Sequence, residues 1–306
     1  MARKKQESAA LDVTGDDFTQ DLIVSLNKEF GSRIAYNLST DASHVSIKRW
    51  ISTGSKQLDY IISNRPNGGM PEGRIIEIFG LPSTGKSHIA FEAVKAIQRM
   101  GGLAVYVDTE NAMSIEKLNE LGINTARRFV FIESHCTESV LSIIESTVEK
   151  ARSAVKDVPV LCVWDSVAGS SPKAELEGNY EDSTIGLQAR TLSKGMRKIV
   201  PVIADNNVTL MCLNQTRTKI GTMFSDPTVV PGGAAIPFHA SVRIQLYGGQ
   251  PIKSKSDPDM IVGIRTACKV IKNKVAPPWR KCEFNIIFGH GIVEHEQVFD
   301  VLKGAK

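Results

Sequence analysis

An eight-residue segment at positions 80–87 constrains the fold more than any other part of this chain. Its sequence, GLPSTGKS, matches the pattern GxxxxGK[ST]. It follows an apolar run at 74–80 and opens a helical stretch at 86–100, which is the strand–loop–helix context that the pattern requires. There the glycines let backbone N–H groups surround phosphates, and the helix N-terminus favours negative charge. The segment therefore predicts a phosphate-binding loop made of Gly80, Leu81, Pro82, Ser83, Thr84, Gly85, Lys86 and Ser87.

Two side chains of this loop and a distant aspartate are expected to bind ATP and Mg²⁺. Lys86 would reach the β- and γ-phosphates, and the Ser87 hydroxyl would ligate Mg²⁺. Asp165 ends the apolar run at 160–164, so its carboxylate would hold the same ion through water. An aspartate at a strand end is, taken alone, more typical of a turn or a helix cap. Because a phosphate-binding loop lies upstream, the Mg²⁺-binding role is the favoured interpretation of Asp165.

Two further polar residues end expected strands, at the sheet edge where open α/β folds bind ligands. Glu110 ends the run at 103–110 and is the candidate general base, which would orient or deprotonate the attacking water. Gln215 ends the run at 208–215, where its amide would sense the γ-phosphate. A lone glutamine is usually a surface residue, but this series of strand ends favours a functional role.

Apolar runs alternate with helical segments from about residue 46 onward. The runs expected as buried strands are rich in Val, Ile and Leu and span 74–80, 103–110, 158–166 and 208–215. The helical segments between them include 86–100, 137–155 and 186–206. Further strand-like runs at 240–247, 262–271 and 282–288 extend or flank the sheet. This succession predicts the α/β class, with a mostly parallel central sheet flanked by helices on both faces.

The N-terminal part differs from this core. Residues 1–15 are polar, and the following segment has the features of a helix that ends at Gly31. Its apolar residues at helical spacing are Leu22, Ile23, Leu26 and Phe30. A polar stretch to about residue 45 separates this stripe from the core, so two interpretations of the helix stay open. In the first, the helix folds back onto its own core; in the second, it is an arm that docks on another subunit.

Two long segments, 171–185 and 216–231, are expected as loops on the ligand-binding edge of the sheet. The second combines cations with apolar side chains and is followed by two glycines, which suits single-stranded nucleic acid. The first is acidic and would act through its backbone and Ile185. The candidate DNA-binding residues are Ile185, Arg190, Lys194, Arg197, Arg217, Lys219, Ile220, Gly221, Met223, Phe224, Gly232 and Gly233. Arg190, Lys194 and Arg197 have helical spacing and are equally well explained as a solvated helix face.

Composition narrows the class of protein. The net charge of +4 permits a polyanionic partner without requiring one, so a nucleic-acid site should be local. The five cysteines form no CxxC pair and the six histidines have no ligand spacing, which gives no support to a metal site built from side chains alone. The basic N-terminus lacks an apolar leader, and no run approaches the ~18 apolar residues of a membrane span. We therefore expect a cytoplasmic protein without a membrane partner.

A pair of lysines, Lys272 and Lys274, shares one face of the run VIKNKVAPP if that run is extended. Taken alone, such a pair is more often an exposed, charged strand edge.

The motifs together resemble the bacterial RecA recombinases from about residue 17 to 300. The resemblance rests on ISTGSKQLD, PEGRIIEIFGLPSTGKS, VYVDTENA, DSVAGSSPKAELEG, LNQTRTKIGTMF, GGAAIPFHASVRI and VIKNKVAPP, in that order. It implies a RecA-type P-loop ATPase core at 46–293, preceded by a tail and polymerisation helix at 1–45 and followed by a short tail at 294–306. It also implies an ATP-dependent recombinase that forms filaments on single-stranded DNA and exchanges strands with homologous duplex DNA. A single-strand-binding protein and loading factors would be further partners.

The resemblance also implies roles for single residues. Glu110 would be the catalytic glutamate, and Gln215 would couple the nucleotide state to the second DNA loop. Met223 and Phe224 would be among the intercalating or spacing residues. Lys272 and Lys274 would act across the subunit interface on the neighbour's ATP phosphates. Phe238 would lie at that same interface, and the helix at 17–30 would be the polymerisation arm.

Three departures from the family pattern stand out. The chain stops near residue 306, where the family continues into a C-terminal domain and an acidic tail, which puts duplex capture and tail-based regulation in doubt. Lys117 replaces the usual tyrosine against the adenine, so base selectivity would be looser. Pro237 replaces the usual lysine beside Phe238, which would alter subunit coupling. A compact chain of this kind would suit a bacteriophage as well as a bacterium.

Two alternatives from other classes remain open at this point. One is a nucleotide-gated scaffold that coats DNA or assists repressor self-cleavage with little strand exchange. The other is a DNA-translocating motor on the same core, which would form closed rings, whereas an exposed N-terminal arm favours an open filament.

Overall fold

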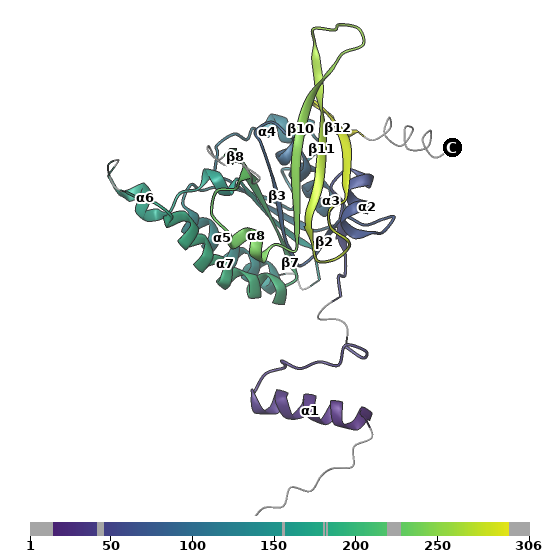
Figure 1. The fold of residues 1–306 in the computed structure, drawn as a ribbon, viewed down its shortest axis with the longest axis vertical. Helices are drawn as coiled ribbons and strands as arrows, with labels where there is room; N and C mark the ends of the chain where they lie inside the picture. Colours follow the sequence, from purple (N-terminus) through teal and green to yellow (C-terminus); the bar gives the residue numbers. More distant parts are fainter. Residues whose placement is uncertain are drawn as a thin grey trace, which may run out of the picture. The chain divides into compact units, whose positions relative to one another are not determined.

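The computed structural model describes residues 15–41, 46–154, 157–179, 181, 183–218 and 228–293 (Figure 1). The chain divides into two compact units, one up to residue 48 and one from residue 49 onward. The first unit contains α1 (Gly15–Glu29), which agrees with the helix expected from the apolar spacing. Leu22 is 45% exposed and Phe30, just after the helix, is 62% exposed. The Asn27 side chain accepts hydrogen bonds from the backbone N–H groups of Ile34 and Ala35, which holds the following turn.

The second unit is built on one large sheet. In the described part of the chain this sheet has nine strands, in the order β13-β12-β11-β10-β3-β7-β6-β4-β5. The strands are β3 (Ile75–Gly80), β4 (Leu103–Asp108), β5 (Phe129–Glu133), β6 (Val160–Asp165), β7 (Val208–Gln215), β10 (Val242–Lys253), β11 (Ile261–Asn273), β12 (Lys281–Ile287) and β13 (Gly291–Val293). The six strands from β10 to β5 are parallel to their neighbours, and β11, β12 and β13 continue the sheet in antiparallel fashion. The predicted α/β class with a mostly parallel sheet is therefore confirmed.

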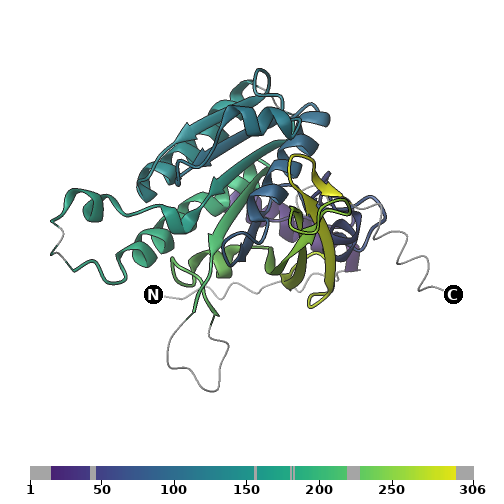
Figure 2. The same cartoon turned by 90° about the horizontal axis from the view of Figure 1, so that it is seen from above.

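Helices cover both faces of this sheet (Figure 2). The described helices of this unit are α2 (Lys56–Ser63), α3 (Lys86–Arg99), α4 (Ile115–Glu120), α5 (Thr137–Ala154), α6 (Lys173–Glu177), α7 (Leu187–Asp205) and α8 (Ala235–His239). Of these, α6 buries none of its residues and projects away from the sheet (Figure 2). The smaller described strands are β1 (Trp50–Ile51), β2 (Met70–Pro71), β8 (Arg217–Thr218) and β9 (Thr228–Val229). None of the helices in the described ranges is long and apolar enough to span a bilayer.

Strand side chains alternate between two cores, because successive residues of a strand point to opposite faces. On β6, Leu161 and Val163 belong to the cluster with α3, whereas Cys162 and Trp164 belong to the cluster with α5 and α7. The buried residues of α7 recur at helical spacing and are Leu192, Met196, Ile199 and Ile203. Strands that are buried on both faces have continuous apolar runs in the sequence, which is why these strands could be predicted from it.

The structure corrects some of the sequence expectations. The segment 171–185 is not a continuous loop, because it contains the short helix α6. The strand β5 was not predicted, although its first four residues, 129–132, are apolar; at the sheet edge its side chains are exposed or half-buried. The expected strand 103–110 ends at Asp108, so Glu110 stands two residues beyond it. β10 continues to Lys253, and Figure 1 shows the β10–β11 hairpin reaching beyond the other strands.

Candidate active site

The phosphate loop joins the end of β3 to the start of α3, as the motif predicted. Two of its positions require glycine, one because of close packing against backbone and one because of its own backbone conformation. A Cβ added to Gly80 would lie 2.4 Å from the Leu246 carbonyl oxygen, and one added to Gly85 would lie 2.2 Å from Cδ1 of Ile286. Gly85 also has φ +93°, a conformation that other residues rarely adopt. The loop is therefore held against β10 and β12, with its backbone at the N-terminus of α3.

The Lys86 side chain is folded back over this loop. Its Nζ atom donates hydrogen bonds to the carbonyl oxygens of Gly80 at 3.2 Å and Leu81 at 2.8 Å, and the residue is 7% exposed. Burial lowers the pKa of Lys86, and the nearby carboxylates of Asp165 and Glu110 oppose that shift. Because this ammonium group is already partly desolvated, it loses few water contacts when it binds a phosphate oxygen.

Asp165 lies at the centre of an oxygen cluster beside the loop. Its Oδ2 atom accepts hydrogen bonds from the Ser87 hydroxyl at 2.8 Å and from the Tyr106 hydroxyl at 2.5 Å. Burial raises the pKa of Asp165; the two hydrogen bonds lower it, and the carboxylates of Glu110 and Asp108 raise it further. A serine hydroxyl and a carboxylate are the hard oxygen donors that suit Mg²⁺, so the residues present fit that ion. Tyr106 was not predicted, since it occupies an ordinary position in an apolar strand.

Glu110 connects the ends of three strands. Its Oε1 atom accepts a hydrogen bond from Nε2 of Gln215 at 2.8 Å and another from the Ser166 hydroxyl. Asp108 holds the turn that carries Glu110, because its Oδ1 atom accepts from the Glu110 backbone N–H at 2.8 Å. The two candidates from the ends of β4 and β7 are thus in direct contact. Ser166, which follows Asp165, is a further site residue that the sequence did not single out.

One open cavity of about 380 Å³ brings most of the predicted nucleotide residues together. Its lining consists of Pro82, Ser83, Gly85, Lys86, Ser87, His88, Glu110, Lys117, Asp165, Gln215, Ile264 and Phe288. His88, Ile264 and Phe288 were not predicted. Lys117 is in the cavity wall, with its Nζ atom 5.9 Å from the ring centre of Phe91.

Lys272, Lys274 and Phe238 do not line this cavity. The Nζ atom of Lys272 donates to the carbonyl oxygens of Pro237 and Phe238, both at 2.7 Å. Burial lowers the pKa of Lys272, as do the charges of Lys274 and Arg243, while Glu77 opposes the shift. Lys274 is exposed and the Phe238 side chain is 72% exposed on α8. These three residues thus form a separate group on the β11–α8 side of the unit.

A network of buried charged and polar side chains lies within the sheet, centred on Glu77. Glu77 is fully buried on β3, and its carboxylate accepts from Nε of Arg243 at 2.5 Å and from Nδ2 of Asn214 at 3.4 Å. Burial raises the pKa of Glu77, with Arg243 as the main opposing charge. Asn214 also donates to the Pro231 carbonyl oxygen at 3.2 Å, next to the predicted glycine pair. The network therefore includes Asn214, which directly precedes Gln215, and reaches Pro231, which directly precedes Gly232.

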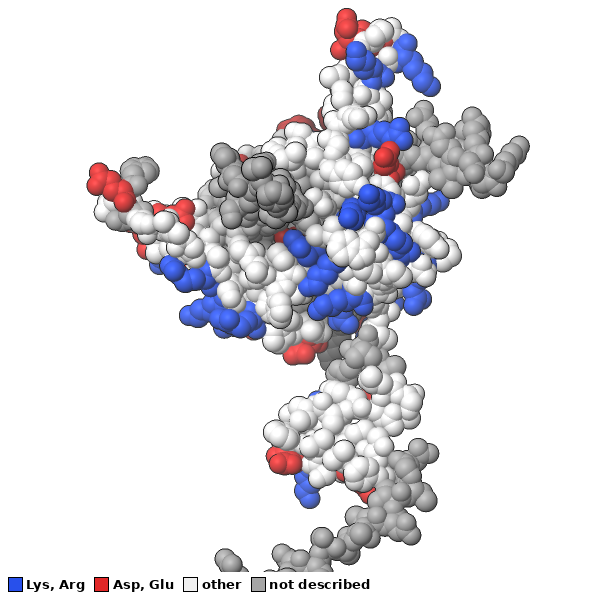
Figure 3. Space-filling view, viewed as in Figure 1, with Lys and Arg blue, Asp and Glu red and all other residues white. Residues whose placement is uncertain are grey.

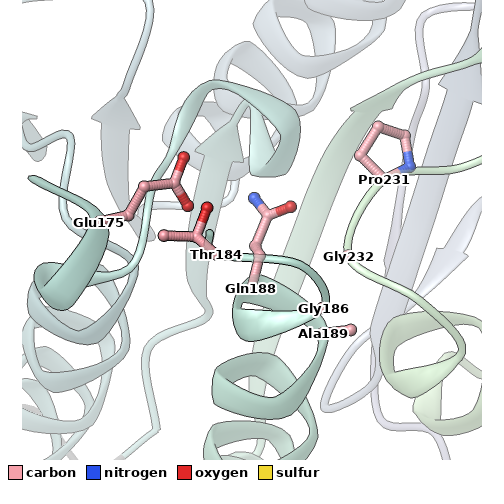
Figure 4. A pocket seen from close by; sticks show the side chains of 7 residues that line it. All are labelled: Glu175, Thr184, Gly186, Gln188, Ala189, Pro231 and Gly232. Carbon is pink, nitrogen blue, oxygen red and sulfur yellow. The ribbon is translucent and has the colours of Figure 1, made fainter. Parts of the chain in front are cut away.

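The predicted DNA-binding residues fall into three groups. Ile185 is 88% exposed at the start of α7, close to a second cavity of about 380 Å³. Figure 4 shows the lining side chains of Glu175, Thr184 and Gln188 opposite Pro231. Gly232 and Gly233 both have positive φ, and Gly232 lines the cavity. Arg190, Lys194 and Arg197 are exposed on α7, and Figure 3 shows basic side chains over that helix and over β10–β12.

The remaining DNA candidates cannot be compared with the structure. Lys219, Ile220, Gly221, Met223 and Phe224 lie outside the described residues, and Arg217 is described only as part of the strand β8. β8 pairs with β9 in antiparallel fashion, with Arg217 opposite Val229.

A phosphate loop, an oxygen pair for a cation and a carboxylate–amide contact meet at one edge of a mostly parallel sheet. This arrangement defines the chain as a P-loop protein of the α/β class. A family model described as the RecA N-terminal domain matches residues 19–293. The chain is 40% identical to Protein RecA of Chloroherpeton thalassium over 279 residues, which cover 91% of this chain and 74% of that relative.

Two other relatives give the same result. Protein RecA of Citrifermentans bemidjiense is 39% identical over 282 residues, covering 92% of this chain and 79% of the relative. Protein RecA of Bacteroides thetaiotaomicron is 39% identical over 276 residues, covering 90% and 79%. The chain belongs to the RecA family, and the resemblance found in the motifs is confirmed.

Proposed function

We propose that this chain is an ATP-dependent homologous recombinase. It forms filaments on single-stranded DNA, pairs that strand with a homologous duplex and exchanges strands, with DNA-stimulated hydrolysis of ATP. The observation that carries the proposal is the hydrogen bond from Gln215 Nε2 to Glu110 Oε1 at 2.8 Å. Gln215 ends β7 just before the predicted DNA loop, and Glu110 lines the nucleotide cavity. The name Protein RecA, carried by relatives about 40% identical over nine-tenths of the chain, supports the same conclusion.

The nucleotide chemistry is assigned to four residues of the first cavity. Lys86 exchanges its hydrogen bonds with the loop carbonyls for the β- and γ-phosphates. Ser87 and Asp165 hold Mg²⁺, which neutralises phosphate charge when bound. Glu110 orients the attacking water and accepts its proton, since it is the carboxylate of the cavity that is not committed to the Ser87 cluster.

The subunit contacts are assigned to residues outside that cavity. Lys272 and Lys274 reach the ATP phosphates of the neighbouring subunit, and Phe238 lies in the same interface. Their exposed or half-buried positions away from the chain's own nucleotide cavity support a role in trans. The helix within residues 1–45 is the polymerisation arm, with Leu22, Ile23, Leu26 and Phe30 as its docking side chains. The exposure of Leu22 and Phe30 supports this assignment.

Single-stranded DNA binds along the predicted loops and the basic face of α7. Arg190, Lys194 and Arg197 supply phosphate contacts, and their joint exposure on one helix supports that role. Gly232 and Gly233 allow the backbone after the second loop to turn close to the DNA. The core at 46–293 is the functional unit, and the protein acts in the cytoplasm.

The test is strand exchange between a circular single strand and a homologous linear duplex, with ATP and Mg²⁺. Electron microscopy of the same reactions gives the form of the assembly. The proposal predicts helical filaments and joint molecules that need ATP and homology. Filaments without joint molecules would point to a DNA-coating scaffold or a co-factor for repressor cleavage. Closed rings would point to a DNA motor and would contradict the proposal.

A further inference from the structure

Two cysteines face each other directly across the antiparallel part of the sheet. Cys268 on β11 is the register partner of Cys282 on β12, and their Sγ atoms are 3.2 Å apart. Cys268 is fully buried, whereas Cys282 is half-buried. Residues directly opposite each other in an antiparallel ladder are near enough for a disulfide, whose S–S bond is about 2.05 Å long. The sulfurs need to approach by about 1.2 Å to form that bond.

The other described thiols lack such a partner. Burial raises the pKa of the Cys162 thiol to about 12, and burial also raises the pKa of Cys212. Both lie in the core on the central strands and are inert to reagents in water. Cys136 is half-buried but is not opposite another cysteine. Cys282 is therefore the thiol that combines access from solvent with a second thiol at contact distance.

The strands that carry this pair also support the phosphate loop. Thr266, two residues before Cys268, is fully buried and donates a hydrogen bond from Oγ1 to the Thr84 carbonyl oxygen at 3.1 Å. Ile286, four residues after Cys282, lies so close to Gly85 that an added Cβ would be 2.2 Å from its Cδ1 atom. A change in the separation of β11 and β12 is thus transmitted to the loop through these two contacts.

We propose that Cys268 and Cys282 form a reversible thiol–disulfide site behind the phosphate loop, oxidised by a low-molecular-weight disulfide such as oxidised glutathione. The Cys282 thiolate attacks one sulfur of that disulfide, giving a mixed disulfide and releasing one reduced thiol. Cys268 then loses its proton and attacks Cys282 Sγ, which closes the protein disulfide and releases the second thiol. Two protein thiols are oxidised and one disulfide is reduced to two thiols, so electrons and protons balance.

Closing the bridge lowers the affinity for ATP. Drawing β12 toward β11 shifts Ile286, whose Cδ1 atom occupies the space beside Gly85, and so displaces the loop from its phosphate-binding geometry. We expect this displacement to lower the ATP affinity by about tenfold, which corresponds to about 1.4 kcal/mol. Reduction by dithiothreitol removes the bond and restores binding. Because ATP binding is measured without DNA, this result does not depend on strand exchange.

The experiment uses the full chain, treated with oxidised glutathione and then freed of reagent. Mass spectrometry is expected to show a loss of two hydrogens per chain, with the peptides of Cys268 and Cys282 linked. Equilibrium dialysis is expected to show the drop in ATP affinity and its recovery with dithiothreitol. The matched controls are Cys282→Ala, which cannot form the bridge, and Cys136→Ala, which can. The first should bind ATP equally before and after oxidation, and the second should respond like the unmodified chain.

Two results would overturn the proposal. One is a chain in which Cys136 takes up glutathione while Cys268 and Cys282 remain thiols. The other is a stable mixed disulfide on Cys282 that Cys268 never resolves. A closed bridge with unchanged ATP affinity would refute the coupling to the phosphate loop, even though the disulfide had formed. Because the mapping is made on the unmodified chain, none of these outcomes depends on a variant that folds poorly.

Discussion

Gln215 and Glu110 lie 105 residues apart in the sequence, yet Nε2 of Gln215 donates a hydrogen bond to Oε1 of Glu110 at 2.8 Å. The bond joins the last residue of β7 to the turn after β4, across the intervening strand β6. The glutamate lines the nucleotide cavity, and the glutamine precedes the segment predicted to bind DNA. A movement of that segment would thus reach the candidate general base through one side chain.

Glu110→Gln is expected to separate ATP binding from hydrolysis. The amide keeps the size of the side chain and one acceptor oxygen for Gln215 and Ser166, but it cannot accept the proton of the attacking water. We expect ATP affinity to change little and single-turnover hydrolysis to fall by about 10²–10⁴. The control is Glu116→Gln on α4, whose side chain is exposed outside the cavity. Undiminished hydrolysis in the Glu110 variant would remove this residue from the catalytic role.

Tyr106→Phe is expected to weaken Mg²⁺-dependent ATP binding, because Asp165 loses one of its two hydroxyl donors. The Tyr106 hydrogen bond lowers the pKa of Asp165, so its removal raises that pKa and favours the neutral acid. Loss of a bond to a charged group costs about 1.5–3 kcal/mol. The acid limb of the binding profile should therefore move to higher pH. Tyr247→Phe on β10 is the control, and an identical shift in both variants would contradict this reading.

His88 is expected to make the folded protein sensitive to acid. Burial lowers the pKa of His88 to about 4, assisted by the charges of Lys117 and Lys95. Between pH 6.5 and 4 the unfolded chain then binds a proton that the folded chain does not, so stability falls as the pH falls. The loss reaches about 3 kcal/mol at most. Denaturant unfolding of His88→Gln should be less dependent on pH across this window, and parallel profiles would contradict the assignment.

Leu22→Asp in α1 is expected to reduce filament formation. A charge in the apolar stripe would have to be desolvated when the arm docks on a neighbour, while the core keeps its own contacts. We expect ATP binding to remain within about twofold, as for other surface changes, and filaments to be lost in sedimentation and electron microscopy. Lys28→Gln in the same helix is the control. Normal filaments of the Leu22 variant would show that the stripe does not mediate assembly.

Local patterns in the sequence predicted much of the fold and part of the candidate site. The glycine-rich loop has its residues within one short segment, and buried parallel strands have continuous apolar runs. Tyr106 could not be assigned in the same way, because a tyrosine in an apolar run has the pattern of a core residue. Its role depends on Asp165, which the sheet places on the neighbouring strand β6. The Glu77–Arg243 pair likewise joins residues 166 positions apart.

The short helix α6 was missed for a different reason. It has only five residues and lies between a proline and a glycine, which are turn signals in the sequence. The edge strand β5 has an apolar run at 129–132 that is only four residues long and was overlooked; its place at the edge of the sheet follows from its pairing with β4, which the run alone does not reveal.

In the proposed function, DNA binding and ATP hydrolysis are coupled through Gln215 and Glu110. The most direct test measures ATP hydrolysis with and without single-stranded DNA, with Lys86→Ala as the blank. We expect strong stimulation by DNA in the unmodified chain and no hydrolysis in the blank. Hydrolysis that is the same with and without DNA, in a folded chain that binds ATP, would contradict the coupling.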